Sequence, residues 1–234
     1  ELLLFDRKLA DSELLAMEDY LRVKWFGGEL KDFPLLVRFG SSHHPDFNHA
    51  TFADPTQGAD LRFYDHQNRE LPYELEDWND SGETLAWVKL NQLDAEQKIY
   101  AYWGNSSNST LPSYRNDGSV WPNFEGVWHM GDTIDAAKNR TLNTSGNPVL
   151  NSLGITGKAT SLDGNDHLSA TGYKGIANHD PRSMSLWIKT SQPDGSLLSW
   201  GDSSNPWNFK TNSLGPLVSV ANSHIWQGAG SIQD

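Results

Sequence analysis

Two glutamates, Glu74 and Glu76, have the clearest potential for chemistry in this sequence. Apolar and polar residues alternate through segment 71–76, which predicts a β-strand with both carboxylates on one side. Such a pair can hydrolyse a glycosidic bond or hold a cation. The alternative is a solvated strand face beside a turn. We favour that alternative, because antiparallel sheets commonly leave one face in water.

A second group of side chains suits a metal ion. His43, His44, Asp46 and His49 lie in one Pro-containing loop, and imidazole with carboxylate is a ligand set for zinc. No spacing such as H-E-x-x-H accompanies them, and polar loops collect histidines without binding metal. We therefore favour an ordinary polar loop.

A third group offers oxygen ligands, which suit calcium. Asp163, Asn165 and Asp166 lie in a tight, Gly-containing stretch, and Asp132 and Asp135 could contribute from a neighbouring loop. The alternative is a simple turn in which Asp163 bonds the backbone. We favour the turn, but among the metal candidates this group has the best residue types, and calcium is the one cofactor that the sequence suggests.

The ten tryptophans could fill the space between sheets or stack on sugar rings. For any single tryptophan, core packing is the commoner role. Four lie in polar surroundings and are the expected exposed, glycan-binding rings: Trp78, Trp103, Trp207 and Trp226. Three lie within strand patterns and are expected in the core: Trp87, Trp128 and Trp187.

The composition disfavours several classes of function. A formal net charge of −12 argues against nucleic acid and anionic membrane surfaces, because phosphate binding needs a basic patch. The chain has no cysteine, which removes thiolate catalysis and thiolate metal sites. No window holds the ~20 apolar residues that a membrane span needs. Phosphate-binding and nucleophile-elbow motifs are also missing from the sequence.

Short strands must position these side chains. Five stretches rich in aromatic and β-branched residues are bounded by Gly, Pro, Asn or Asp: 33–39, 58–65, 71–76, 86–90 and 99–105. They predict an all-β protein containing a small antiparallel β-sandwich. Upstream, Glu1–Phe5 predicts a strand, and Asp11 or Ser12 caps an amphipathic helix that ends at Gly27-Gly28. The expected apolar stripe of that helix is Leu14, Met17, Leu21 and Trp25.

Two family resemblances give these segments a context. The ordered motifs FPLLVRF, GADLRFYD, LPYELEDW, AWVKL and IYAYWGN resemble domain-of-unknown-function family 2341. That resemblance implies a bacterial exported or envelope protein, in which laminin-G-like domains or a TolQ/ExbB-type proton channel can be neighbours. Residues 5–25 resemble the end of a laminin-G-like (concanavalin A-like) domain. Residues 121–129 resemble the strand that opens the next domain, and three later stretches resemble its early strands: 157–168, 183–190 and 197–201.

The resemblances imply four parts. Residues 1–28 would end an upstream laminin-G-like domain, and 29–105 would form the family-2341-like domain. Residues 106–118, rich in Ser, Asn, Thr and Pro, would form a linker. Residues 119–234 would begin a second, truncated laminin-G-like jelly roll.

Together these observations predict a non-catalytic module of an exported bacterial protein, located outside the cell, on its surface or in the periplasm. Glycans or other surface proteins are its expected partners, without nucleic acid and without membrane insertion of this chain. The alternative is a structural or sensory periplasmic domain of an envelope complex beside a TolQ/ExbB-type channel. A weaker alternative is an accessory part of a glycan-active enzyme.

Overall fold

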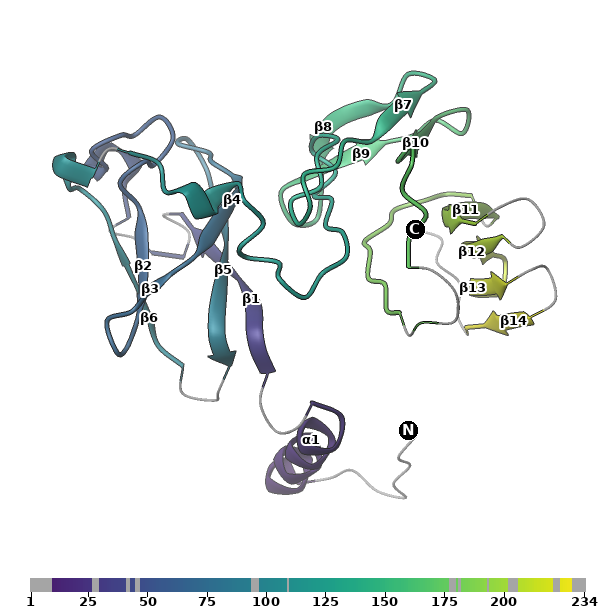
Figure 1. Ribbon diagram of the computed structural model, residues 1–234, viewed down its shortest axis with the longest axis horizontal. Coiled ribbons are helices and arrows are strands. Elements are labelled where there is room, and N and C mark those ends of the chain that lie inside the picture. Colours follow the sequence, from purple (N-terminus) through teal and green to yellow (C-terminus); the bar gives the residue numbers. More distant parts are fainter. Residues whose placement is uncertain are drawn as a thin grey trace. The chain divides into compact units, whose positions relative to one another are not determined.

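The computed structural model describes eleven stretches: 10–26, 30–40, 43–44, 47–93, 97–108, 110–176, 180, 182–192, 194–201, 206–220 and 224–228. The side chains of 14, 17, 20, 22, 24–26 and 224–227 lie outside this description. The chain divides into two compact units, Glu1–His167 and Leu168–Asp234. Strands dominate both units (Figure 1), so the all-β prediction is confirmed.

The helix predicted near the N-terminus is present as α1 (Asp11–Phe26). Glu13 caps its first turn, because its carboxylate accepts from the backbone N–H of Ala10 at 2.9 Å. Leu15 and Val23, which are not part of the predicted apolar stripe, are 65% and 54% exposed. The remaining expectations here lie outside the described residues: the strand Glu1–Phe5, the stop at Gly27-Gly28, and the side chains of Leu14, Met17 and Trp25.

Two three-stranded antiparallel sheets build the sandwich of the first unit (Figure 1). The first sheet has the order β1 (Leu30–Phe39), β5 (Thr84–Leu93), β4 (Tyr73–Asp77). The second sheet has the order β3 (Glu70–Leu71), β2 (Arg62–Asp65), β6 (Ile99–Tyr102). Each of the five predicted stretches contains a strand. The stretch 71–76 is divided between the two sheets at Pro72, which has no N–H for a ladder hydrogen bond.

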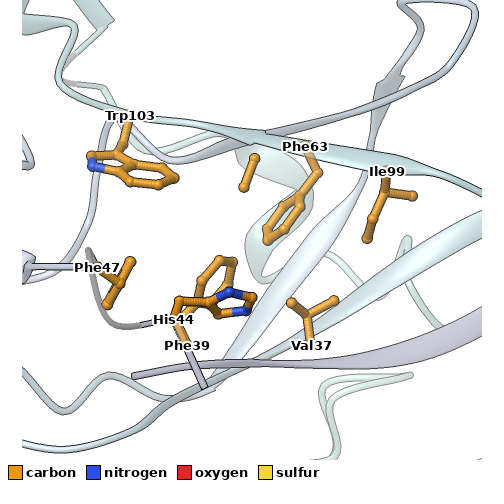
Figure 2. A pocket seen from close by; sticks show the side chains of 8 residues that line it. Val37, Phe39, His44, Phe47, Phe63, Ile99 and Trp103 are labelled. Atoms are coloured by element: carbon orange, nitrogen blue, oxygen red, sulfur yellow. The ribbon is translucent and has the colours of Figure 1, made fainter. Parts of the chain in front are cut away.

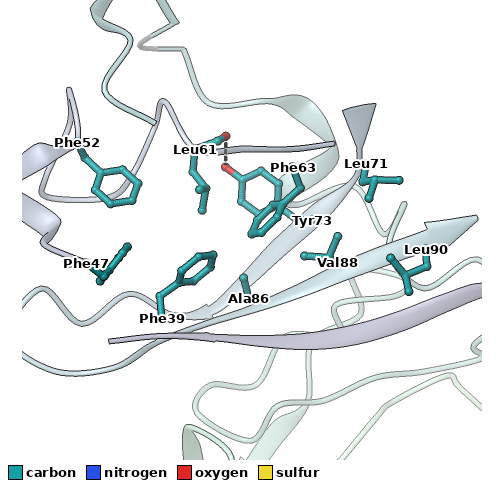
Figure 3. Packing of buried hydrophobic residues seen from close by; sticks show 10 residues of the cluster. All are labelled: Phe39, Phe47, Phe52, Leu61, Phe63, Leu71, Tyr73, Ala86, Val88 and Leu90. Atoms are coloured by element: carbon teal, nitrogen blue, oxygen red, sulfur yellow. Dashed lines mark hydrogen bonds between the residues drawn. The ribbon is translucent and has the colours of Figure 1, made fainter. Parts of the chain in front are cut away.

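The core lies between the two sheets (Figure 3). Its buried residues are Phe39, Phe47, Phe52, Leu61, Phe63, Leu71, Tyr73, Ala86, Val88 and Leu90. Tyr73 is fully buried, and its hydroxyl donates to the Leu61 carbonyl at 2.9 Å. Burying one large apolar side chain contributes about 1.5–3 kcal/mol, so this cluster is the main source of stability in the unit.

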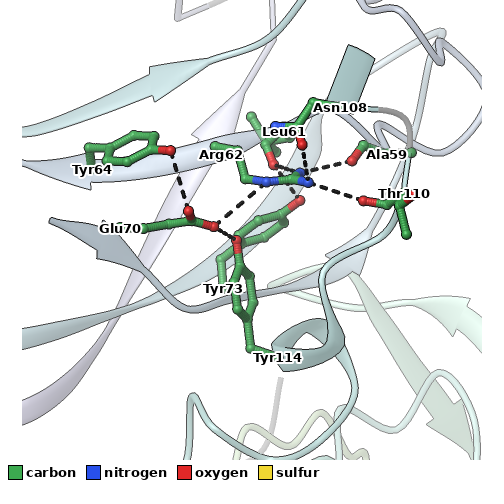
Figure 4. Close-up of polar contacts among 9 residues, drawn as sticks. All are labelled: Ala59, Leu61, Arg62, Tyr64, Glu70, Tyr73, Asn108, Thr110 and Tyr114. Atoms are coloured by element: carbon green, nitrogen blue, oxygen red, sulfur yellow. Dashed lines mark hydrogen bonds and ion pairs between the residues drawn. The ribbon is translucent and has the colours of Figure 1, made fainter. Parts of the chain in front are cut away.

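Residues 106–118, expected as a linker, make specific contacts with the second sheet (Figure 4). The buried guanidinium of Arg62 donates to Asn108 Oδ1 at 3.1 Å and to the Thr110 carbonyl at 3.0 Å. The hydroxyl of Tyr114 donates to Glu70 Oε1 at 2.5 Å. These bonds hold the segment against the sandwich.

The rest of the first unit is largely irregular. The predicted strand at 121–129 is not formed, because its backbone bonds to a loop instead of to a neighbouring strand. Asp135 accepts from the Val127 N–H at 2.9 Å, and the Val127 carbonyl accepts from the Ala136 N–H at 2.8 Å. The remaining elements of this unit are β7 (Asn143–Ser145), β8 (Val149–Leu153), β9 (Lys158–Ser161), and three short 3-10 turns, η1 (His49–Thr51), η2 (Ser106–Asn108) and η3 (Ser113–Arg115).

Strands form at both ends of the stretch 157–168, as β9 and as β10 (His167–Ser169), but β9 pairs with β8. In the second unit, four strands form an antiparallel meander: β11 (Gly195–Trp200), β12 (Trp207–Asn212), β13 (Gly215–Val220) and β14 (His224–Gln227). The strand expected at 197–201 is therefore confirmed as β11.

The prediction of a strand at 183–190 is wrong. Described residues 182–190 have no regular structure, and Trp187 is 77% exposed instead of lying in the core. A strand is held by its neighbours, and none of the described strands pairs with this segment.

Candidate functional site

Glu74 and Glu76 lie on the outer face of β4, which is not solvated as we expected. Their side chains are 15% and 3% exposed, because three ring side chains cover them. Trp121 Nε1 donates to Glu74 and Trp87 Nε1 donates to Glu76, both at 2.6 Å. His129 lies between the carboxylates, with Nε2 3.1 Å from Glu74 Oε1 and Nδ1 3.6 Å from Glu76 Oε2. We call these five residues the His129 clasp.

Burial and charge oppose each other in the clasp. Burial raises the pKa of Glu76, against the lowering effects of His129 and of the Trp87 N–H. Burial lowers the pKa of His129, but the Glu74 hydrogen bond and the nearby carboxylates outweigh it, so this pKa lies above its usual value. The raised pKa favours the protonated imidazole, whose positive charge offsets the negative charge of the two glutamates beside it. These contacts hold Trp121 and His129, and with them segment 121–129, against the first sheet.

The histidine loop does not converge on one point in the described residues. His43 Nε2 lies 2.6 Å from Glu83 Oε1, whereas the buried His49 shares a hydrogen bond of 2.9 Å with Thr84 Oγ1. His44 faces a separate apolar cleft, and Asp46 lies outside the described residues. Across the described part of the chain, no three His, Cys, Asp or Glu side chains are grouped to hold a metal ion.

The candidate calcium ligands lie together in a turn between β9 and β10. Asp166 accepts from the backbone N–H groups of Asp163 at 3.1 Å and of Asn147 at 2.6 Å, and Asp163 accepts from Asn165 at 3.2 Å. These bonds match the turn alternative, and calcium binding here stays a prediction. Of the suggested helpers, Asp132 caps the N–H of Ile134, and Asp135 is buried against Arg140 at 2.7 Å.

Trp78 and Trp103, two of the predicted ligand-binding rings, meet around Phe52. Trp103 stacks on Phe52 with ring centroids 5.3 Å apart, and Trp78 meets Phe52 edge-on at 5.0 Å. The indole N–H of Trp103 donates to Thr51 Oγ1 at 2.8 Å, and that of Trp78 donates to the Pro55 carbonyl at 3.1 Å. Both rings are half-buried and contribute to the core as well as to the surface.

The other two predicted ligand-binding tryptophans belong to the second unit. Trp207 is half-buried and stacks on Trp200 with a centroid separation of 4.1 Å. The side chain of Trp226 lies outside the described residues. Trp87 and Trp128, which we expected in the core, are both half-buried.

An apolar cleft opens between β1 and β6, the strands at one edge of the sandwich (Figure 2). Its volume is about 600 Å³, and its lining is Val37, Phe39, His44, Phe47, Phe63, Ile99, Ala101 and Trp103. Trp103 is the predicted ligand-binding residue that lines it.

Three tyrosines on the outer face of the second sheet were not predicted as a site. Phe63 and Ala101 pack into the core, so Tyr64 on β2 and Tyr100 and Tyr102 on β6 point outward. Tyr100 and Tyr102 are 46% and 54% exposed, and Tyr64 meets Tyr102 edge-on at 5.6 Å. The signal available in the sequence was two tyrosines at positions i and i+2 of a predicted strand, which places both rings on one face. We call these three residues the tyrosine face.

No helix in the described residues is long and apolar enough to cross a membrane. Comparison with curated proteins and with solved structures finds no match. A comparison with protein families does find one, over a stretch that begins after β1 and continues past the sandwich to include Trp121 and His129. Residues 57–144 match the model of a domain of unknown function, DUF2341.

Proposed function

We propose that the chain is a non-catalytic recognition module of an exported bacterial surface or envelope protein. It binds a glycan or a partner protein through aromatic side chains of its β-sandwich. The location outside the cytoplasm and the laminin-G-like character of residues 1–28 and 119–234 belong to the same proposal. They rest on the family resemblances of the sequence.

The state of the carboxylate pair supports a non-catalytic role. A glycoside hydrolase needs two carboxyl groups that flank a sugar and its attacking water. Here the hydrogen-bond and ion-pair partners recorded for Glu74 and Glu76 are indole and imidazole rings of the same chain, at 2.6–3.6 Å. A sugar would have to displace the segment that carries Trp121 and His129.

The observation that carries the proposal is the tyrosine face. Aromatic rings that gather on the surface of a sheet can mark an interaction site, because a large contiguous apolar patch in water is unfavourable. Tyrosine also suits an interface, since its ring stacks while its hydroxyl stays hydrogen-bonded. Tyr100 and Tyr102 are about half exposed and lie two residues apart on an edge strand.

The purified chain can be tested on an array that carries glycans and bacterial envelope proteins, with calcium and with a chelator. We expect binding to at least one component, and weaker binding by the double variant Tyr100→Ala/Tyr102→Ala. A reducing-end assay on the bound glycans should detect no hydrolysis. Absence of binding across the array, or hydrolysis that Glu76→Gln abolishes, would refute the proposal.

A further inference from the structure

We infer that the tyrosine face binds an uncharged polysaccharide whose chain lies along β6. This inference rests on the recognition function proposed above and names the class of ligand. Four features of the second sheet support it: the spacing of the rings, their fixed orientation, a neighbouring carboxylate, and the charge of the protein.

The spacing of the rings suits a repeating ligand. Tyr100 and Tyr102 project from the same side of β6, and a strand advances about 3.4 Å per residue, so their attachment points lie roughly 7 Å apart. Successive sugar units present apolar C–H faces at a regular interval, and such faces stack on aromatic rings. Two rings in a row along one strand therefore favour an extended chain over a compact ligand.

Contacts within the sheet orient the rings of Tyr64 and Tyr102. Tyr64 pairs with Tyr100 across the strands and also meets Tyr102 edge-on, with centroids 5.6 Å apart. The hydroxyl of Tyr64 donates to Glu70 Oε2 at 3.3 Å (Figure 4). Rings that are already ordered lose little conformational entropy on binding, which favours affinity.

Glu70 supplies a polar contact beside the rings. Its carboxylate accepts the Tyr114 hydroxyl at 2.5 Å and lies 3.6 Å from Arg62 Nε, so its position is fixed. The side chain is still 41% exposed, and a carboxylate accepts about four hydrogen bonds. Sugar hydroxyls are donors that can complete this set.

Charge and donor chemistry select among possible ligands. A chain of net charge −12 with Glu70 at the face repels uronate-rich or sulfated polysaccharides. A proline-rich peptide also stacks on aromatic grooves, but its proline residues have no N–H to donate to a carboxylate. An uncharged polysaccharide offers both the stacking faces and the donors.

The test is affinity electrophoresis and calorimetry of the whole chain with soluble glucan, mannan and xylan. Heparin, polygalacturonate and a proline-rich peptide serve as comparison ligands. We expect at least one neutral polysaccharide to bind more tightly than all three comparison ligands. Tyr100→Ala and Tyr102→Ala should each weaken binding about tenfold, or about 1.4 kcal/mol. Tyr102→Phe keeps the ring and should bind within about threefold of the wild type, corresponding to about 0.65 kcal/mol.

Leu153→Ala is the matched control, because Leu153 is 91% exposed and lies on β8, outside the tyrosine face. It should leave affinity unchanged. If the chain binds a protein or a charged glycan instead, the inference fails and the recognition function stands. If a neutral polysaccharide binds equally well to both Tyr→Ala variants, the tyrosine face is not its site. If none of these ligands binds, the inference fails. The recognition function fails with it only if the array of glycans and envelope proteins also shows no binding.

Discussion

The His129 clasp makes a quantitative prediction about stability. His129→Leu replaces the imidazole between Glu74 and Glu76 with an apolar side chain of similar size. Those carboxylates are 15% and 3% exposed, so they would be left close together with little water. Removing one partner of a buried charge pair costs about 3–5 kcal/mol. Because two indole N–H groups remain on the carboxylates, we expect the lower end, about 3 kcal/mol.

Urea unfolding followed by tryptophan fluorescence can measure this loss, since Trp87 and Trp121 lie in the clasp. Adding Glu76→Gln to His129→Leu should restore much of the stability, because the uncompensated buried charge is then removed. His43→Leu is the matched control: His43 also pairs with a glutamate, at 2.6 Å, but is 44% exposed. It should cost less than about 1 kcal/mol. A His129→Leu variant as stable as His43→Leu would refute the reasoning.

The same comparison has a defined dependence on pH. The pKa of His129 is raised in the folded state. At pH values between the unfolded and the folded pKa, His129 therefore binds a proton when the chain folds. The stabilisation by His129 is therefore complete below pH 6.5, the usual value for histidine, and is lost as pH rises through the higher folded pKa. The pKa of Glu76 is also raised in the folded state, so its contribution to stability likewise falls as pH rises above 4.5. We expect the difference in unfolding free energy between wild type and His129→Leu to shrink from pH 6 to pH 9. A difference that grows over this range would contradict the assignment.

Three further predictions concern other parts of the chain. Gly58→Ala should lower the free energy of unfolding by about 2 kcal/mol or more, because φ is +60° and a Cβ would lie 2.4 Å from the Trp78 ring. An unchanged midpoint of urea unfolding would contradict this prediction. Asp60→Asn should cost about 2 kcal/mol at neutral pH, since buried Asp60 accepts three backbone N–H groups. Burial alone would raise its pKa, but these N–H groups lower it, so the cost should vanish as pH falls through that lowered pKa. Calcium should raise the melting temperature and a chelator lower it if residues 163–166 hold the ion; a melting temperature that neither moves would remove calcium from the proposal.

The strands of the sandwich were predictable because each carries its own local signal. Alternation of apolar and polar residues defines β4, and aromatic or β-branched runs define β1, β5 and β6. The division at Pro72 was also readable in principle, since proline cannot donate to a ladder. What local pattern could not predict was the role of residues 106–118, whose polar composition resembles a linker. Their structure depends on Arg62, which is distant in sequence and offers several donors to them.

The site was harder to predict, because covering a sheet face is a long-range event. Alternation places Glu74 and Glu76 on one side of the strand, but it does not reveal what lies over them. Trp121 and His129 are 47 and 55 residues away from Glu74 in sequence. Similarly, Trp187 matches a strand pattern, yet it is exposed where none of the described strands pairs with its segment.

The two outer faces of the sandwich are therefore not equivalent. On the first sheet, segment 121–129 covers the carboxylates of β4 through the His129 clasp. On the second sheet, Tyr100 and Tyr102 remain about half exposed. A ligand that competed for the first face would have to break charge-assisted hydrogen bonds, whereas one that met the second face would displace only water. Binding at the tyrosine face should for this reason leave the clasp intact. The pH dependence of the clasp and the affinity for polysaccharide should then vary independently, so that His129→Leu lowers stability without changing the dissociation constant under conditions where the chain is folded.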